Sequence, residues 1–338
     1  MGGDLKEIAR LSGVAVSSVS RALTGKPGVS REKRREILEI ASRIGYRPNP
    51  EARTLRTGRA SDLLVIIQDR PNDITSYRNH ALIVLAGGAF ERVRVQTCSA
   101  SDPLAALLAR AAEEGVAAVI VSGVQEEVPH RVAQQLEEAA TAVVCLDCTK
   151  RLAPESNTID RVDIDRESGA YEAARLLLSR AGRETLFFAK KELCEVDARL
   201  TGIRRACVDA GFTLSKRMLV PVEGDDFAEG REVTRALLRR NPPRGLFCYN
   251  DKLAVGALRA ISEKGLRVPD DIMVVGFDDL SFAAYLTVPL TTVAQPVVAC
   301  AEAAVDLALL RREDPRRPVD RRLFESRLVV RETAAPRK

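Results

Sequence analysis

From residue 62 onward, short β-rich runs alternate with amphipathic helical segments, and few folds are compatible with that rhythm. The first series of runs is DLLVIIQ, RVRVQTC, AAVIVSG and AVVCLD. After about residue 160 the series restarts with ETLFFA, MLVPV, GLFCY and IMVVGF, separated by helical patterns near 167–181, 198–210, 227–240 and 251–264. Strands separated by helices form parallel sheets that helices cover on both faces. The sequence therefore predicts two doubly wound α/β lobes with a ligand cleft at the carboxyl ends of their strands.

The first sixty residues have a different pattern, that of short helices joined by a glycine turn. The positions at helical spacing in DLKEIARLSG are Leu5, Ile8, Ala9 and Ser12. Gly13 suits the end of this helix because glycine tolerates the backbone of a helix C-terminus. In the next helix the inward stripe is Val19, Ala22 and Leu23, and the opposite face carries Val16, Ser17, Ser20, Arg21 and Thr24. This arrangement predicts an all-α head with a helix-turn-helix.

A third helix is predicted from Ser30, a favourable N-cap, to Gly45. Its apolar positions are Ile37, Leu38, Ala41 and Ile44. Residues 1–60 contain thirteen Lys or Arg and six Asp or Glu, a net charge of +7, whereas the whole chain carries +5 and the remainder therefore −2. A basic excess confined to the head is expected if only the head meets phosphates, although an ordinary helical bundle with a solvated basic surface remains the alternative.

The segment after the third helix is suited to fold only on a partner. Asn49 can act as an N-cap and Pro50 fits a first helical position, but a helix over 50–57 is too short to be stable alone. Folding of this segment must then be coupled to binding. Leu55 is apolar in a polar stretch and has no evident core to enter.

Two stretches of the head, GVAVSSVSRALTGKPGVS and GYRPNPEARTLRTGR, closely resemble the lac repressor (LacI/GalR) family of bacterial regulators in motif, order and spacing. The resemblance implies a second helix in the DNA major groove and a hinge helix that presses Leu55 into the minor groove, flanked by Arg53 and Arg56. It assigns base contacts to Val16, Ser17 and Arg21 and phosphate contacts to Ser20, Thr24, Ser30 and Tyr46. Val16 has the alternative of being simply an apolar residue at a helix start.

The resemblance continues at FCYNDKLAVGALRAISEKGLRVPDDIMVVGFDDLSFAAYLTVPLTTVAQP, which is similar to the effector-binding region of the same family. It implies a two-lobed sensor like the periplasmic sugar-binding proteins, with three chain crossings between the lobes. The expected domains are a helix-turn-helix domain (1–48), a hinge and linker (49–60) and an effector and dimerisation domain (61–338). The expected lobes are 61–161 with 292–322 and 162–291 with 323–338.

Matched by position, six residues are expected to hold a small polar metabolite, most simply a sugar or sugar derivative. They are Asp147, Arg199, Phe227, Asn250, Asp278 and Gln295. An arginine fork donates, a carboxylate accepts from paired hydroxyls or ring nitrogens, and an aromatic ring stacks on a sugar face or a base. Asp278 and Asp279 have the alternative of forming a solvated turn. Tyr77 and Arg78 either reach the ligand from the first lobe or lie in a surface loop.

The resulting hypothesis is a cytoplasmic, homodimeric repressor that binds pseudo-palindromic double-stranded DNA under metabolite control. Enzymatic phosphate-loop and nucleophile-elbow motifs are absent from the sequence, and it has only two histidines.

No cofactor or metal is expected. The Cys145/Cys148 pair lacks a second pair to complete a zinc site, and Asp163, Asp165 and Glu167 lack the other parts of a calcium loop. No apolar stretch is long enough to cross a bilayer. A catalytic sensor and a binding module without DNA are the remaining alternatives.

Overall fold

The computed structural model describes residues 5–15, 18–19, 30, 33, 35–37, 40, 62–69, 72–148, 159–190 and 197–335. The chain divides into two compact units, residues 1–61 and residues 62–338. Among the described residues, no helix combines the length and the apolar character needed to cross a membrane. Six of the seven cysteines, including Cys145 and Cys148, are buried and free, and Cys194 lies outside the described residues.

In the first unit, the helix α1 (Leu5–Ser12) ends where the sequence predicts, at Gly13, whose φ is +68°. The hydroxyl of Ser30 accepts a hydrogen bond from the backbone N–H of Lys33 at 3.2 Å, which is the geometry of a helix N-cap. The buried apolar residues described here are Ile8, Val19, Ile37 and Ile40. Apolar residues from all three predicted helices are thus removed from water, as a three-helix core requires.

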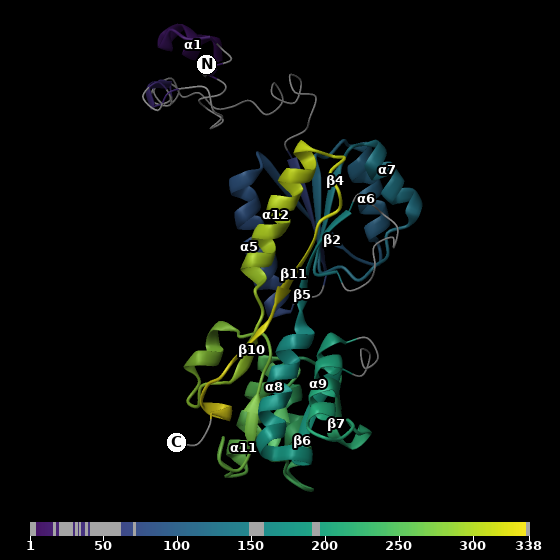
Figure 1. Cartoon of the computed structure of the whole chain (residues 1–338), viewed down its shortest axis with the longest axis vertical. Coiled ribbons are helices and arrows are strands. Elements are labelled where there is room, and N and C mark those ends of the chain that lie inside the picture. Colours follow the sequence, from purple (N-terminus) through teal and green to yellow (C-terminus); the bar gives the residue numbers. More distant parts are fainter. Residues whose placement is uncertain are drawn as a thin grey trace. The chain divides into compact units, whose positions relative to one another are not determined.

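The first lobe of the second unit contains a six-stranded parallel sheet with the strand order β11-β5-β4-β3-β1-β2. Its strands are β1 (Asp62–Gln68), β2 (Arg92–Cys98), β3 (Ala118–Ser122), β4 (Ala142–Leu146), β5 (Ile159–Asp165) and β11 (Arg321–Glu325). The helices α5 (Asp73–Ala89) and α12 (Val297–Glu313) lie side by side on one face, and α6 (Leu104–Glu113) and α7 (His130–Glu138) cover the other (Figure 1). Every residue of β3 and β4 is buried, which explains their unbroken apolar runs.

The second lobe contains a four-stranded parallel sheet with the strand order β7-β6-β8-β9. Its strands are β6 (Thr185–Lys190), β7 (Leu219–Val222), β8 (Gly245–Phe247) and β9 (Met273–Val275). The helices α8 (Arg166–Ala181) and α9 (Ala198–Asp209) pack on one face, and α10 (Phe227–Leu237) and α11 (Asp251–Glu263) pack on the other. Beside them, β10 (Thr292–Ala294) pairs antiparallel with β12 (Arg327–Val329). Short 3-10 helices span Gly182–Glu184, Lys216–Met218, Ser281–Tyr285 and Glu332–Ala334.

A buried ion pair fixes the end of α12 against the first sheet. Arg311 donates to Asp160 from Nη2 at 2.6 Å and from Nε at 3.1 Å, and Asp160 also accepts from the backbone N–H of Asp320 at 2.8 Å. Asp160 is fully buried, so these partners replace the water that its carboxylate loses. The bond to Asp320 places the chain for β11, which begins at the next residue and pairs with β5.

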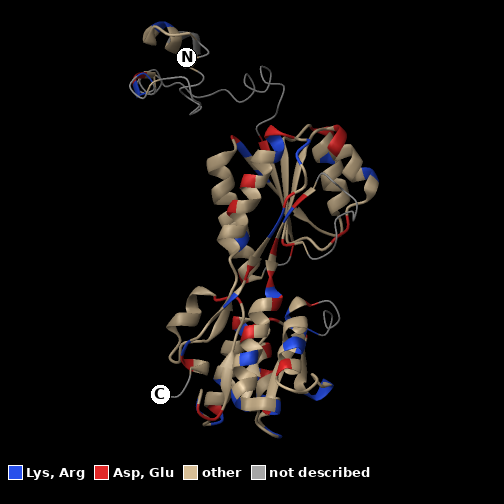
Figure 2. Cartoon of the chain, viewed as in Figure 1, with Lys and Arg blue, Asp and Glu red and all other residues tan. Residues whose placement is uncertain are grey.

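The chain crosses between the lobes three times, after β5, between β10 and α12, and between β11 and β12. The lobe limits expected from the sequence (161, 291 and 322) fall a few residues before these crossings. The difference arises because β5 and β11 continue in the first sheet to residues 165 and 325, while β10 packs with the core of the second lobe. Charged residues of both signs gather on β5 and β11 near the crossings (Figure 2).

Asp165, at the end of β5, is the N-cap of α8 and accepts from the backbone N–H of Ser168 at 3.0 Å. The carboxylate therefore has a structural role at the lobe crossing. Within the part of the chain that the structure describes, no group of histidine, cysteine or carboxylate side chains is arranged to hold a metal ion.

Candidate ligand-binding site

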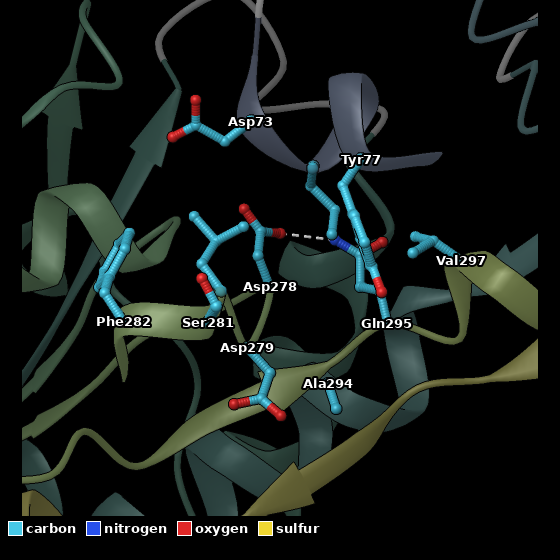
Figure 3. A pocket seen from close by; sticks show the side chains of 11 residues that line it. Asp73, Tyr77, Asp278, Asp279, Ser281, Phe282, Ala294, Gln295 and Val297 are labelled. Carbon is cyan, nitrogen blue, oxygen red and sulfur yellow. Dashed lines mark hydrogen bonds between the residues drawn. The ribbon is translucent and has the colours of Figure 1, made fainter. Parts of the chain in front are cut away.

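A cavity of about 520 Å³ lies between the two lobes at the carboxyl end of β9 (Figure 3). The first lobe contributes Asp73, Ile74 and Tyr77 from the first two turns of α5, and Val297 from the start of α12. The remaining lining residues are Asp278, Asp279, Leu280, Ser281, Phe282, Ala294 and Gln295. Ligands of parallel α/β sheets bind at this edge of the sheet, so the cavity is the candidate site.

Asp278 and Gln295 form the polar centre of the cavity. Gln295 donates from Nε2 to Asp278 Oδ1 at 2.5 Å, and the two side chains point toward each other in Figure 3. Burial raises the pKa of Asp278 to about 6, although the charge of Arg199 and the Gln295 hydrogen bond act to lower it. Gln295 Oε1 is buried and accepts no hydrogen bond from a described residue. A ligand with two adjacent hydrogen-bond donors would donate one to the Asp278 carboxylate and the other to Gln295 Oε1.

The structure separates the roles of the adjacent carboxylates Asp278 and Asp279. Asp278 is only 7% exposed, which argues against a solvated turn. The Asp279 carboxylate is turned away from Asp278 in Figure 3 and pairs with Arg331 at 2.8 Å. Both residues have positive φ, 120° and 54°, a conformation that aspartate tolerates better than most residues. The two side chains are thereby directed to different partners.

A third carboxylate, Asp251, lies behind this pair and was not found from the sequence. It is fully buried and accepts from Thr292 Oγ1 at 2.5 Å and from the backbone N–H of Leu280 at 2.7 Å. Burial, followed by the negative charge of Asp278, raises the pKa of Asp251 to about 8. Asp251 therefore anchors the loop that carries the cavity wall.

Aromatic rings border the cavity from both lobes. Phe282 is on the wall, and Phe227 packs against it with ring centroids 6.0 Å apart. Phe227 itself is 46% exposed and adjoins the wall without being part of it. Tyr77 lines the cavity from α5, so the alternative that Tyr77 and Arg78 occupy a surface loop is wrong. Between the lobes, Lys252 Nζ lies 2.8 Å from Asp73 Oδ2.

Three of the expected ligand residues are engaged elsewhere. Asn250 is the N-cap of α11: it accepts from the backbone N–H of Leu253 at 2.8 Å and donates to the carbonyl of Asp225 at 2.9 Å. Arg199 lies over the rings of Tyr249 and Phe277, at 4.1 and 4.4 Å from their centroids. Its Nε is buried without a partner among the described residues. Burial alone would lower the pKa of Arg199, but the nearby Tyr249 and Asp197 raise it, and its charge acts on Asp278.

Asp147 is the third of these residues, and both of its carboxylate oxygens are occupied. Arg166 donates to them at 2.6 and 2.7 Å, and Arg78 donates to Oδ2 from the other side. Although burial acts to raise it, the pKa of Asp147 is held at about 2 by the charges of Arg166 and Arg78. Of the six expected ligand residues, two thus line the cavity, Phe227 adjoins it, and ligand contact by the others stays a prediction.

Of the expected DNA contacts, only Ser30 belongs to the described residues, where it is exposed and caps a helix. The others lie outside the described residues: Val16, Ser17, Ser20, Arg21, Thr24, Tyr46, Arg53, Leu55 and Arg56. Their roles stay predictions that rest on the resemblance.

Comparison with known proteins connects the head and the lobes. Residues 182–334 match a periplasmic binding protein-like domain, and residues 4–49 match the bacterial regulatory proteins of the lacI family. A relative from Vibrio cholerae named HTH-type transcriptional repressor PurR is 26% identical over 340 residues, which cover 95% of this chain and 94% of the relative. The chain therefore combines a LacI-family helix-turn-helix domain with a periplasmic binding protein-like domain. With these two domains, it is a DNA-binding transcriptional regulator and not an enzyme.

Solved structures have the same fold as this chain. A lac repressor dimer bound to operator and an anti-inducer superposes with a TM-score of 0.70 at 23% identity, covering 99% of this chain and 100% of that one. A complex of the transcriptional regulator CelR with cellobiose gives a TM-score of 0.65 at 24% identity, covering 98% and 99%. The family fold thus extends over the whole chain, head and lobes together.

Proposed function

We propose that this LacI-family regulator is a cytoplasmic repressor that binds a pseudo-palindromic operator as a homodimer and is controlled by an uncharged polyhydroxylated ligand, a sugar or sugar derivative. The observation that carries the ligand class is the composition of the cavity wall. It combines the acceptors of Asp278 and Gln295 with the rings of Tyr77 and Phe282, and none of the described residues that line it is Lys or Arg.

A sugar offers hydroxyl donors along its edge and an apolar face, which suit carboxylate and amide oxygens beside aromatic rings. A phosphorylated ligand would bring negative charge next to the carboxylates of Asp73, Asp278 and Asp279. The cations that balance two of these carboxylates, Lys252 and Arg331, are already paired with them. Like charges disfavour each other most where water is excluded, so a neutral sugar is favoured over a sugar phosphate. The cellobiose complex of CelR agrees with this ligand class.

On the DNA side, the +7 charge of residues 1–60 supplies phosphate attraction, and Val16, Ser17 and Arg21 read base edges. Two hinge segments, one from each protomer, order on the operator and insert their Leu55 side chains. The ligand changes operator affinity by binding one lobe arrangement better than the other, because a ligand with equal affinity for both shifts nothing. The arrangement of the lobes then decides whether the paired hinge segments can form.

The test combines a ligand screen with a DNA selection on the full-length protein. Thermal shift against monosaccharides, disaccharides, sugar phosphates and nucleosides is expected to give stabilisation by an uncharged sugar. The variant Asp278→Ala should lose that shift, whereas Asp306→Asn, which removes an exposed carboxylate of α12 outside the cavity lining, should keep it.

In the DNA selection, a symmetric duplex should be enriched from random sequence, and the stabilising sugar should change its retention. Stabilisation by sugar phosphates or nucleosides alone would refute the ligand class. Failure to enrich any symmetric duplex, with and without these compounds, would refute the mode of DNA binding.

A further inference from the structure

The first lobe presents less of its ligand-binding edge to the cavity than a parallel sheet usually does. Ser122 ends β3 and Asp147 directly follows β4, at the carboxyl edge where ligands of such sheets are held. Neither residue is among the described residues that line the cavity, and the first-lobe part of the wall comes from α5 and from Val297 at the start of α12. Something else covers the ends of β3 and β4.

That cover is the side chain of Arg78, which is 3% exposed. It extends from α5, one turn after the wall residue Ile74 and on the same face of the helix. Its Nε donates to Ser122 Oγ at 3.1 Å and its Nη1 donates to Asp147 Oδ2. Its Nη2 lies so close over Gly123 that a Cβ at that position would overlap it. Arg78 thus occupies the space directly above three residues at the sheet edge.

The polar groups beneath Arg78 are already hydrogen-bonded within the protein. Ser122 accepts from Arg78 and donates to Asn79 Oδ1 at 2.7 Å. Asp147 accepts from Arg78 and, with both oxygens, from Arg166. Buried polar groups with such partners gain little from an additional ligand. The carboxyl edge of β3 and β4 is therefore closed to a ligand in two ways: Arg78 fills the space above it, and its polar side chains already have hydrogen-bond partners.

We infer that Arg78 is a specificity-determining plug that fills the first-lobe half of the cleft and restricts the ligand to a compact one, of monosaccharide size. The ligand then meets the first lobe at Asp73 and Tyr77 of α5 and at Val297 of α12, and meets the second lobe at Asp278 and Gln295. This assignment of ligand size rests on the proposed function, whereas the plug itself does not.

Removal of the plug is compatible with folding. In Arg78→Ala the Asp147 carboxylate keeps both hydrogen bonds from Arg166, so no buried charge is left uncompensated. The variant Arg78→Met is the matched control, because its long apolar side chain fills most of the same space without the guanidinium. If the volume of the Arg78 side chain is what covers the sheet edge, Arg78→Ala should expose Ser122 and Asp147, whereas Arg78→Met should keep them covered.

The first test needs no ligand. Ser122→Cys places a thiol beneath the plug, and its reaction with methyl methanethiosulfonate is followed in the full-length protein by peptide mass spectrometry. The thiol should react about tenfold or more faster in the double variant Ser122→Cys/Arg78→Ala than in Ser122→Cys alone. The reason is that a covered group reacts only when its cover opens. In the Arg78→Met background the rate should stay low.

The native thiol of Cys207, buried in the second lobe, reports general loosening in the same samples. Equal rates at position 122 with and without the plug would overturn the proposal. A parallel rise at Cys207 would also overturn it, since Arg78 would then act through stability.

The second test measures ligand size by calorimetry with D-glucose, D-ribose, cellobiose and maltose. Arg78→Ala should raise the affinity for disaccharides relative to monosaccharides by about tenfold, a change of the size that one added group of contacts supplies. An unchanged ratio would refute the role of Arg78 in selecting ligand size. Binding of none of these sugars by either protein, together with an exposed thiol in the first test, would refute the sugar class and leave the plug standing.

Discussion

Replacing Asp251 with asparagine should change how the stability of this protein depends on pH. Asp251 is fully buried, and its pKa is raised from an ordinary 3.8 to about 8, first by burial and then by the charge of Asp278. Between these two values the unfolded chain is ionised while the folded chain keeps the proton. The contribution of Asp251 to stability is therefore fully present below pH 3.8 and is lost as the pH rises toward 8.

The size of the effect follows from the shift. Each pH unit in this window costs the wild type about 1.4 kcal/mol, so the whole shift corresponds to about 6 kcal/mol. When the pH is raised from 5 to 7, the free energy of unfolding should fall by about 3 kcal/mol more for the wild type than for Asp251→Asn. The amide can still accept from Leu280 and can donate to Thr292 Oγ1. Any offset from re-formed hydrogen bonds is the same at each pH and leaves the slope unchanged.

The assay is urea unfolding of the full-length protein at pH 5, 6 and 7, followed by far-ultraviolet circular dichroism because the chain has no tryptophan. Asp306→Asn, which removes a carboxylate from an exposed position of α12, is the control and should differ from the wild type by a constant amount. Parallel pH profiles for the wild type and Asp251→Asn would refute the reasoning, because they would mean that Asp251 titrates alike in both states.

Three further changes test the two binding surfaces. With the pKa of Asp278 at about 6, its ionised fraction falls from about 0.9 at pH 7 to about 0.1 at pH 5, so calorimetry should show sugar affinity falling roughly tenfold over this range, and Asp278→Asn should abolish the pH dependence. A wild-type affinity that stayed constant would exclude Asp278 as the ionised acceptor. Arg21→Ala should relax base preference at one operator position by about 1 to 3 kcal/mol in a binding-site selection, and unchanged selectivity would remove it from the base contacts. Leu55→Ala should reduce DNA bending and specific affinity in gel-shift assays but preserve weak, salt-sensitive association, and equal bending by both proteins would exclude the wedge.

Local pattern predicts the bounds of those strands in which the β-rich run and the pairing with a neighbouring strand end at the same residue. The strands β1 and β2 have the predicted bounds, 62–68 and 92–98. In the second lobe, β8 stops at Phe247 although the apolar run continues to Tyr249, because the backbone then leads into Asn250, the N-cap of α11. The residues after Phe247 are apolar because they pack in the core, where Cys248 is buried. Their apolar character therefore does not indicate a longer strand.

The site could be predicted only in part, because its chemistry depends on contacts between distant segments. Asp278 and Gln295 were expected from the resemblance and do line the cavity. The partner of Arg78, Asp147, lies 69 residues away, and no periodicity or spacing relates them. Asp251 gives a local signal, an acid in the first turn of a helix, but the helix dipole explains an acid there without any site.

Among the described residues, two ion pairs join the lobes, and they differ in burial. The pair between Arg166 and Asp147 is largely buried, with side-chain exposures of 16% and 10%, and it lies at the β5 crossing. Breaking it would leave the largely buried guanidinium of Arg166 without the carboxylate that accepts its hydrogen bonds, at a cost of several kcal/mol, although Asp147 would keep its bond from Arg78. The pair between Lys252 and Asp73 is more exposed, at 23% and 48%, and exposed pairs contribute only about 0 to 1 kcal/mol. Of these two links between the lobes, the pair of Lys252 and Asp73 is therefore the one that costs less to break, and the pair of Arg166 and Asp147 at the β5 crossing is the one that costs more.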